Sequence, residues 1–302
     1  NTERLLKKVI KDVKGIELEE FPRMPYKEAM DKYGSDKPDI RFGMEINDIT
    51  NVVSDMDFVV FKSNIEEGGF VKAINFEGGA VLGRKQIDKL VDFAKDHKAK
   101  GLIWIAYKED GVKSSIAKFL SEEKANEIKE AMGAKDGDLV LIVSDAYKNA
   151  VESLGALRLH IAKEFDLIKN KDEFKFLWVT EFPLLSYDEE EKRYVAEHHP
   201  FTMPMDEDLE LLTTDPLKVR AKAYDMVLNG EELGGGSIRI HDSKLQEKLF
   251  NTIGFSDEEA EEKFGFLLQA FKFGPPPHGG LAFGLDRMIM FLGGTDNIKD
   301  VI

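Results

Sequence analysis

Apolar positions near the start of the chain recur at helical spacing. The spacing covers residues 3–13 and again residues 26–33, and a short apolar segment at residues 21–24 lies between the two stretches. Such a period predicts two helices joined by a loop or a short strand. Gly, Ser, Asp and Pro then cluster at residues 34–39, which predicts a polar turn.

The middle of the chain mixes two periods. Short apolar runs rich in β-branched and aromatic residues predict strands at residues 58–61, 71–76, 102–107 and 139–143. Helical spacing between and after them predicts helices at residues 84–95, 122–132 and 146–164. The mixture indicates a compact α+β domain. Its His, Asp and Ser residues form no catalytic cluster, so we expect a folded insertion without chemistry of its own.

The last third of the chain returns to strands with clear turn signals. Residues 174–182 predict a strand, the acidic residues 188–191 a solvated hairpin tip, and residues 223–228 and 232–240 two strands around Asn229-Gly230. Ser256 with Glu259 three residues later forms a capping box that opens a helix with a core-facing apolar stripe. Small residues at 279–287 predict a strand that runs into a helix at residues 288–292.

The Asn-Gly turn brings two acidic residues together. A two-residue turn at 229–230 puts Asp225 and Glu232 on one face of the hairpin, as diagonal neighbours about 7–8 Å apart at Cα. The same count places Gly234 opposite Asp225. Two carboxylates at this spacing can share a hard divalent cation, while phosphates and water complete its shell. The alternative interpretation is two solvated surface acids.

Three consecutive glycines at 234–236 and then Ser237 favour the first interpretation. Glycines weaken a plain strand, so a run of them indicates the close approach of a ligand or backbone, or a bulge. Strict alternation points Arg239 to the opposite face from Glu232, and one bulge in the run reverses that. Arginine grips carboxylates bidentately; the alternative for Arg239 is a surface salt bridge.

Two further segments carry candidate chemistry. Arg287 lies at a predicted strand-to-helix junction beside glycines, where the positive end of the helix suits an anion such as a triphosphate. His198 and His199 are adjacent in a predicted loop. The chain has no cysteine and no second histidine cluster, so hydrogen-bonding roles are favoured over metal binding.

Size and charge narrow the class of protein. At 302 residues the chain predicts two domains. The net charge of -15 argues against its being the main grip on a nucleic acid, without excluding a local basic surface. No apolar run nears the roughly 20 residues of a membrane span, and the first residues lack the apolar core of a signal peptide. The absence of cysteine suits a reducing cytoplasm. Because the first residue is not an initiator, we expect a piece of a longer protein.

Four motifs together resemble bacterial-type aspartyl-tRNA synthetases in order and spacing. They are HHPFT at 198–202, AYDMV at 223–227 with Glu232, GGGSIR at 234–239, and GLDR at 284–287, the last similar to motif 3 of class II synthetases. The segment YGSDKPDIR at 33–41 also looks like that family. The middle block lies where those enzymes carry a GAD insertion domain.

The resemblance implies a fold and a division of the chain. The fold is α+β, with a six-stranded antiparallel sheet of the class II type, flanking helices and a smaller α+β insertion of the GAD type. The implied domains are a first catalytic segment at 1–43, the insertion at 44–168, and a second catalytic segment with motif 3 at 169–302.

The resemblance also implies a reaction and a set of roles. Aspartate and ATP form aspartyl-adenylate, and the aspartyl group then passes to tRNA, chiefly through positioning and charge stabilisation. The implied partners are L-aspartate, ATP with Mg²⁺, tRNA and a second subunit in a homodimer. The implied roles are Mg²⁺ binding by Asp225 and Glu232; ATP binding by Glu232, Gly284, Leu285, Asp286 and Arg287; aspartate binding by His198 and Arg239; and supporting roles for His199 and Ser237.

Several parts of the family pattern do not match any segment of this chain. These are the anticodon-binding barrel, motif 1, motif 2 and the extension after motif 3, so we expect an active site that is incomplete and inactive in this chain alone. Two alternatives remain. An asparagine-forming or lysine-type class II relative is disfavoured by residues 34–39 and by the position of the insertion. A non-catalytic regulatory module is disfavoured because Asp225, Glu232, Arg239 and Arg287 are all present.

Overall fold

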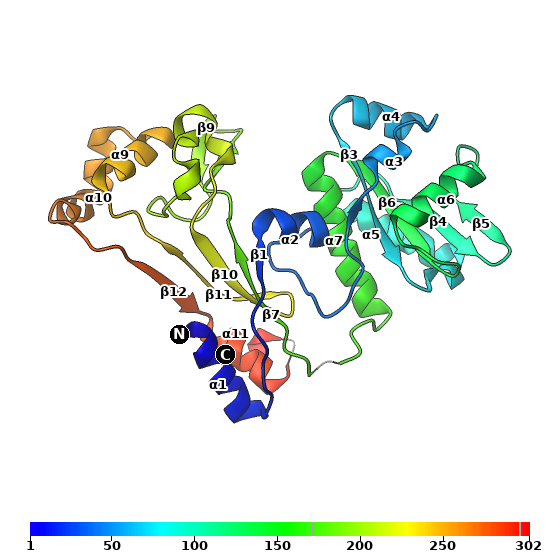
Figure 1. Ribbon diagram of the computed structural model, residues 1–302, viewed down its shortest axis with the longest axis horizontal. Coiled ribbons are helices and arrows are strands. Elements are labelled where there is room, and N and C mark those ends of the chain that lie inside the picture. Colours follow the sequence, from blue (N-terminus) through cyan, green and yellow to red (C-terminus); the bar gives the residue numbers. More distant parts are fainter. Residues whose placement is uncertain (171, 296) are drawn as a thin grey trace. The chain divides into compact units, whose positions relative to one another are not determined.

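The structure is a computed structural model that describes residues 1–170, 172–295 and 297–302. The chain forms two compact units. Unit 1 comprises Asn1–Lys27 and Phe174–Ile302, and unit 2 comprises Glu28–Glu173, so unit 2 is inserted into the sequence of unit 1 (Figure 1). Contacts therefore group residues 28–43 with unit 2, whereas the resemblance implied that they belong to the first catalytic segment.

Unit 1 contains the long strands and the turn signals of the last third of the sequence. Its described elements are α1 (Thr2–Lys14), β1 (Arg23–Pro25), β7 (Phe176–Thr180), β8 (Leu185–Asp188), β9 (Arg193–Ala196), η2 (Asp206–Asp208), α8 (Leu211–Thr214), η3 (Pro216–Lys218), β10 (Ala223–Leu228), β11 (Glu231–Ile238), α9 (Ser243–Thr252), α10 (Asp257–Phe271), β12 (Gly279–Phe283), α11 (Leu285–Gly293) and η4 (Ile298–Asp300).

The main sheet of unit 1 has the order β1-β7-β10-β11-β12. The β7–β10, β10–β11 and β11–β12 pairs are antiparallel, as the resemblance implied, but β1 runs parallel to β7. The described residues thus supply five strands to this sheet. A parallel pair needs a long connection, and the whole of unit 2 separates β1 from β7 in the sequence.

One face of this sheet is covered by the helices at the two ends of the chain (Figure 1). Leu6 and Ile10 of α1 pack against Trp178, Met226 and Leu233, and partly buried side chains of α11 join the same cluster. Burying a side chain of this size contributes about 1.5–3 kcal/mol. The opposite face is therefore the one available for polar side chains.

Unit 2 is an α+β domain with its own antiparallel sheet of order β2-β3-β6-β4-β5. Strand β6 is buried along its whole length, as the continuous run LVLIVSD indicates. The described elements are α2 (Tyr26–Tyr33, which starts at the end of unit 1), β2 (Asn47–Asp48), α3 (Thr50–Val53), α4 (Val59–Glu66), β3 (Phe70–Phe76), η1 (Gly79–Val81), α5 (Arg84–Asp96), β4 (Ile103–Lys108), β5 (Gly111–Ser114), α6 (Glu122–Ala131), β6 (Leu139–Asp145) and α7 (Tyr147–Glu164).

The predicted strand at residues 58–61 is wrong, because the segment belongs to helix α4. Phe61 is fully buried, and its ring meets that of Phe58 edge-on at 5.0 Å, while Val59 and Val60 are exposed. The inward positions Phe58, Phe61 and Ile65 are therefore spaced three and four residues apart, the period of a helix. A four-residue apolar run alone does not distinguish the two structures.

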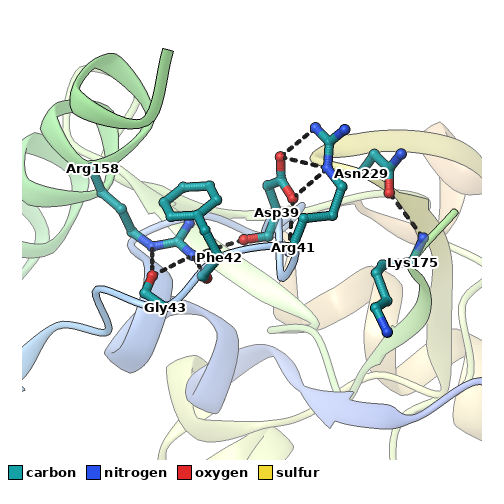
Figure 2. A network of polar contacts seen from close by, with 7 residues as sticks. All are labelled: Asp39, Arg41, Phe42, Gly43, Arg158, Lys175 and Asn229. Carbon is teal, nitrogen blue, oxygen red and sulfur yellow. Dashed lines mark hydrogen bonds and ion pairs between the residues drawn. The ribbon is translucent and has the colours of Figure 1, made fainter. Parts of the chain in front are cut away.

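A buried arginine holds the segment after α2 against α7 within unit 2 (Figure 2). Arg158 is 1% exposed, and its guanidinium donates to the backbone oxygens of Asp39, Phe42 and Gly43 over 2.8–3.2 Å. It also lies over the Phe42 ring, 3.9 Å from the centroid. Desolvation lowers the pKa of Arg158 to about 10. Hydrogen bonds from Arg158 to backbone oxygens thus hold the end of the YGSDKPDIR segment and the two residues after it.

Two other contacts make the same segment rigid. The Asp39 carboxylate accepts from Arg41, with the closest contact at 2.6 Å (Figure 2). A Cβ on Gly34 would collide with the Val151 carbonyl, so only glycine allows this close approach to α7.

The Asn-Gly hairpin predicted from the sequence is present in unit 1. Asn229 and Gly230 both have positive φ, 53° and 89°, as a tight two-residue turn requires. The Asn229 side chain accepts a hydrogen bond from the Lys175 N–H at 2.9 Å (Figure 2). The turn is therefore tied to the start of β7.

No helix in the described residues is both long and apolar enough to cross a membrane.

Candidate functional site

The β10–β11 hairpin contains one extra residue on β11. Val227 pairs with Glu232 and Met226 pairs with Gly234, so Leu233 has no partner of its own. Such a bulge leaves one residue outside the alternating pattern and bends the strand. Leu233 is buried in the helix-covered core, so the bulge turns an apolar side chain inward.

The bulge brings both predicted acids to the same point on the sheet. Asp225 pairs with Gly235, one residue beyond Gly234, which the simple two-residue turn predicted. A Cβ on Gly235 would collide with the Asp225 carboxylate and lie 3.2 Å from Glu232 Oε1. The two carboxylates therefore converge over Gly235, and any larger side chain there would displace them.

Arg239 lies on the same face of the sheet as these acids. Past the bulge, alternation puts Gly235, Ser237 and Arg239 on one side, which is the side of Asp225, the partner of Gly235. The Arg239 N–H donates to the His278 carbonyl at 2.9 Å. Its Nη1 atom is buried and has no hydrogen-bond partner among the described residues. A guanidinium in this condition is ready to receive an anion.

The histidine loop lies beside Arg239. Thr202 forms a β-bridge with Arg239, and its hydroxyl lies 3.4 Å from that of Ser237. Partial burial and the Arg239 charge lower the pKa of His199. The Nδ1 atom of His199 accepts from the Phe201 N–H at 3.2 Å, which also requires an unprotonated Nδ1. His199 and Ser237 are thus close to the candidate site.

His198 and His199 are both exposed, but their contacts differ. The His198 ring meets Phe182 edge-on, with the centroids 5.0 Å apart. This contact places His198 beside the segment that follows β7. Its place near the site therefore depends on the loop to which it belongs.

Arg287 reaches the hairpin from helix α11. Its guanidinium donates to the backbone carbonyl of Glu232, and the Gly284 N–H donates to the Leu233 carbonyl at 2.9 Å. The start of α11 is thereby fixed at the bulge. Gly284, Leu285 and Asp286 are exposed there. Strand β11 therefore connects all four candidate residues: Glu232 lies on it, Asp225 pairs with it from β10, Arg239 directly follows it, and Arg287 contacts it from α11.

The arrangement fits a metal that arrives with a ligand. Among residues 1–170, 172–295 and 297–302, no group of three or more His, Cys, Asp and Glu side chains is placed to hold a metal ion. Asp225 and Glu232 provide two converging carboxylates, so a hexacoordinate cation would need oxygens from elsewhere.

Sequence analysis missed two neighbours of this site. His241 follows Arg239 by two residues and has a buried Nδ1 atom without a partner in the described part of the chain. Gln246 on α9 is fully buried and donates to the Pro200 carbonyl at 2.8 Å. Its position in the stripe with Leu249 and Phe250 was the available signal, because a glutamine among inward residues needs a specific partner.

A groove of about 540 Å³ lies on the helix-covered face of the sheet, the face away from the acids. It is lined by Thr2, Arg23, Trp178, Thr180, Tyr224, Ile238, Gly279, Gly280 and Leu281. Alternation puts Trp178, Tyr224 and Ile238 on the side away from Asp225, so this groove is separate from the acidic site.

Comparison with known proteins gives a consistent picture across the whole chain. The model of the tRNA synthetases class II (D, K and N) family matches residues 1–302. The chain is similar to the aspartate–tRNA ligase of Clostridium botulinum (strain Loch Maree / Type A3), with 71% identity over 99% of this chain and 51% of that protein. It is 67% identical to the ligase of Clostridium novyi (strain NT), again over 51% of that protein. The chain thus spans about half the length of these relatives.

Among solved structures, the aspartyl tRNA synthetase of Entamoeba histolytica aligns with 78% of this chain and 42% of its own, at 20% identity and a TM-score of 0.33.

Proposed function

This chain belongs to the class II tRNA synthetases of the D, K and N group, and from that membership we propose that it is part of an aspartate–tRNA ligase. The full-length protein activates aspartate with ATP and transfers it to tRNA in the cytoplasm. Relatives at 67–71% identity carry that name. The observation that carries the proposal is the convergence of two carboxylates over Gly235 on the face that also presents Arg239.

Arg239 is proposed to select the substrate. Its buried Nη1 has no partner among the described residues, and a carboxylate would supply one with charge-assisted geometry. The side-chain carboxylate of aspartate fits this requirement, whereas the amide of asparagine presents one acceptor and an NH₂ group that would face the guanidinium. His198 contacts the amino acid from its loop, with His199 and Ser237 in support.

The nucleotide is proposed to bind between the acids and the start of α11. Asp225 and Glu232 would hold the Mg²⁺ that accompanies ATP, and the ion would neutralise phosphate charge there. Arg287 stabilises the phosphates, while Gly284, Leu285 and Asp286 line the site at a helix N-terminus.

The first chemical step transfers the adenylyl group. A carboxylate oxygen of aspartate forms a bond to the α-phosphorus, and the bond from that phosphorus to the bridging oxygen breaks, which releases pyrophosphate. In the second step a ribose hydroxyl oxygen of tRNA bonds to the acyl carbon, the bond from that carbon to the phosphate oxygen breaks, and the departing AMP takes up the hydroxyl proton. The protein residues orient the reactants and stabilise negative charge, and they exchange no proton in the first step.

The test is ATP–pyrophosphate exchange by the full-length protein that contains this chain, with aspartate, asparagine or lysine as the amino acid. We expect exchange with aspartate alone. Exchange with asparagine or lysine instead would favour another member of the group. Exchange with none of them would favour a non-catalytic module. The homodimer expected from the resemblance is tested by sedimentation of the same protein.

A second measurement concerns this chain alone, which we expect to bind Mg·ATP weakly and to support no exchange. Calorimetry should detect the binding heat, and Arg287→Ala should abolish it. Arg84→Ala is the matched control, because Arg84 is an exposed arginine on α5 of unit 2. Exchange by this chain at the rate of the full-length protein would refute the expectation that its site is incomplete.

A further inference from the structure

Buried polar atoms without a partner concentrate in one short segment beside the site. In the part of the chain that the structure describes, such side-chain atoms belong to Asn75 in unit 2 and to Arg239, His241 and Gln246 in unit 1. A buried polar atom that is left unpaired destabilises the fold. Their grouping within residues 239–246 indicates that this segment is shaped by binding and not by stability alone.

Gln246 is the member of this set that is completely buried. It lies in the second turn of α9, whose start is fixed by Asp242 accepting from the Leu245 N–H at 2.8 Å. Its Nε2 atom donates to the Pro200 carbonyl at 2.8 Å. An apolar side chain, such as Leu249 one turn later, would fill an inward position without burying an amide. The contact with Pro200 therefore explains why an amide stands here.

Pro200 belongs to the loop that carries both histidines. The neighbouring Phe201 donates its N–H to His199 Nδ1 at 3.2 Å, and its carbonyl accepts from the Ile240 N–H at 2.9 Å. Ile240 directly follows Arg239, so one side of the loop is tied to the strand that presents Arg239. Gln246 ties the loop from the other side, through Pro200.

The Gln246 contact thus holds the residue that directly follows His199. Residues 197–201 contain no helix or strand, and burial together with the Arg239 charge lowers the pKa of the His199 side chain in this loop. Proline at position 200 provides no N–H, so its carbonyl is the backbone group by which this point of the loop can be held.

We propose that Gln246 is a positioning residue for aspartate: its amide fixes Pro200 and so sets the gap between His199 and Arg239 into which the substrate carboxylate fits. Gln246 touches no substrate itself. The inference rests on the proposed function, because it takes aspartate as the ligand of Arg239.

The test compares Michaelis constants in the full-length protein that contains this chain, by ATP–pyrophosphate exchange. Gln246→Leu keeps the bulk of the side chain and removes the donor. The loss of one hydrogen bond of ordinary strength should raise the KM for aspartate about tenfold, while the KM for ATP stays within about twofold. Leu249→Ala is the matched control: it weakens the packing of the same helix by leaving a cavity, and should lower Tm with both KM values unchanged.

Gln246→Glu provides a second readout that a merely structural role would not move. A carboxyl group at this position can donate to the Pro200 carbonyl only when protonated, and burial raises its pKa. We therefore expect the ratio of its aspartate KM to that of the unchanged protein to fall towards one as the pH falls from about 8 to about 6, where protonation restores the donor.

Equal changes in both KM values for Gln246→Leu, or a change in Tm alone, would overturn the proposal, as would a pH-independent ratio for Gln246→Glu. Failure of the proposed function gives a different result, since the unchanged protein would then show no exchange with aspartate.

Discussion

Replacing the buried Arg158 should unfold unit 2 at a much lower denaturant concentration. Arg158→Met keeps a long side chain against the Phe42 ring but leaves three backbone oxygens, those of Asp39, Phe42 and Gly43, without their donor. An unpaired buried carbonyl costs about 1–3 kcal/mol. The desolvation of the guanidinium, which lowers the pKa of Arg158 to about 10, offsets part of that loss. We expect a net loss of about 3 kcal/mol in the free energy of unfolding.

The two tryptophans allow each unit to be followed by itself. Trp104 lies on β4 of unit 2 and Trp178 on β7 of unit 1. In a Trp178→Phe background, fluorescence during urea unfolding reports unit 2 alone, and a Trp104→Phe background reports unit 1. A loss of about 3 kcal/mol corresponds to a drop of roughly 6–12 °C in the Tm of a domain of this size. The unit 1 transition should not move.

Two controls distinguish the effect of the Arg158 hydrogen bonds from the effects of charge and of helix propensity. Arg158→Lys retains the charge but not the planar fork, and should lose about 2 kcal/mol. Lys148→Met makes a similar change at an exposed position of the same helix and should leave stability within about 0.5 kcal/mol. A loss below about 1 kcal/mol for Arg158→Met would show that the backbone contacts of Arg158 do not stabilise unit 2.

Three further predictions concern the site. Gly235→Ala should raise the KM for ATP about tenfold or more in exchange assays of the full-length protein, since the new Cβ displaces both carboxylates; Gly101→Ala, whose Cβ meets nothing within 4 Å, should not, and equal behaviour of the two would contradict the shared cation. Arg239→Lys should raise the KM for aspartate about 100-fold through loss of the bidentate fork, and a change below about threefold would remove Arg239 from the substrate. His199 should titrate by NMR below its ordinary value of 6.5 and move up in Arg239→Gln. In the unchanged protein, the unfolded chain binds more protons than the folded chain between the lowered pKa of His199 and 6.5, so this group makes stability rise with pH across that window. A His199 pKa that is not lowered would exclude the interaction with Arg239.

Sequence patterns located most helices because the boundary signals are local. The capping box at Ser256, for example, forms as predicted: its hydroxyl accepts from the Glu259 N–H, and the Glu259 side chain accepts from the Ser256 N–H. The strand prediction at residues 58–61 is wrong because helix α4 depends on contacts that are not local. Val59 and Val60 favour strands intrinsically, but packing of Phe61 in the unit 2 core decides the structure, and that contact joins residues far apart in sequence.

The site was predictable where it depends on the tight turn and not where it depends on tertiary contacts. The Asn229-Gly230 signal was enough to bring Asp225 and Glu232 to one face. The position of the bulge at Leu233 was not, because a bulge is set by which side chain the core accepts. Gln246 escaped notice for a related reason, since its partner Pro200 lies 46 positions earlier in the chain.

The bulge makes this hairpin sensitive to the parity of its length. With Leu233 counted out of the alternation, an odd number of extra residues between Glu232 and Arg239 would send the guanidinium to the wrong side of the sheet, while an even number would preserve its side and change only its reach. A one-residue deletion here should therefore be as harmful as loss of Arg239 itself, even though every side chain of the site would still be present.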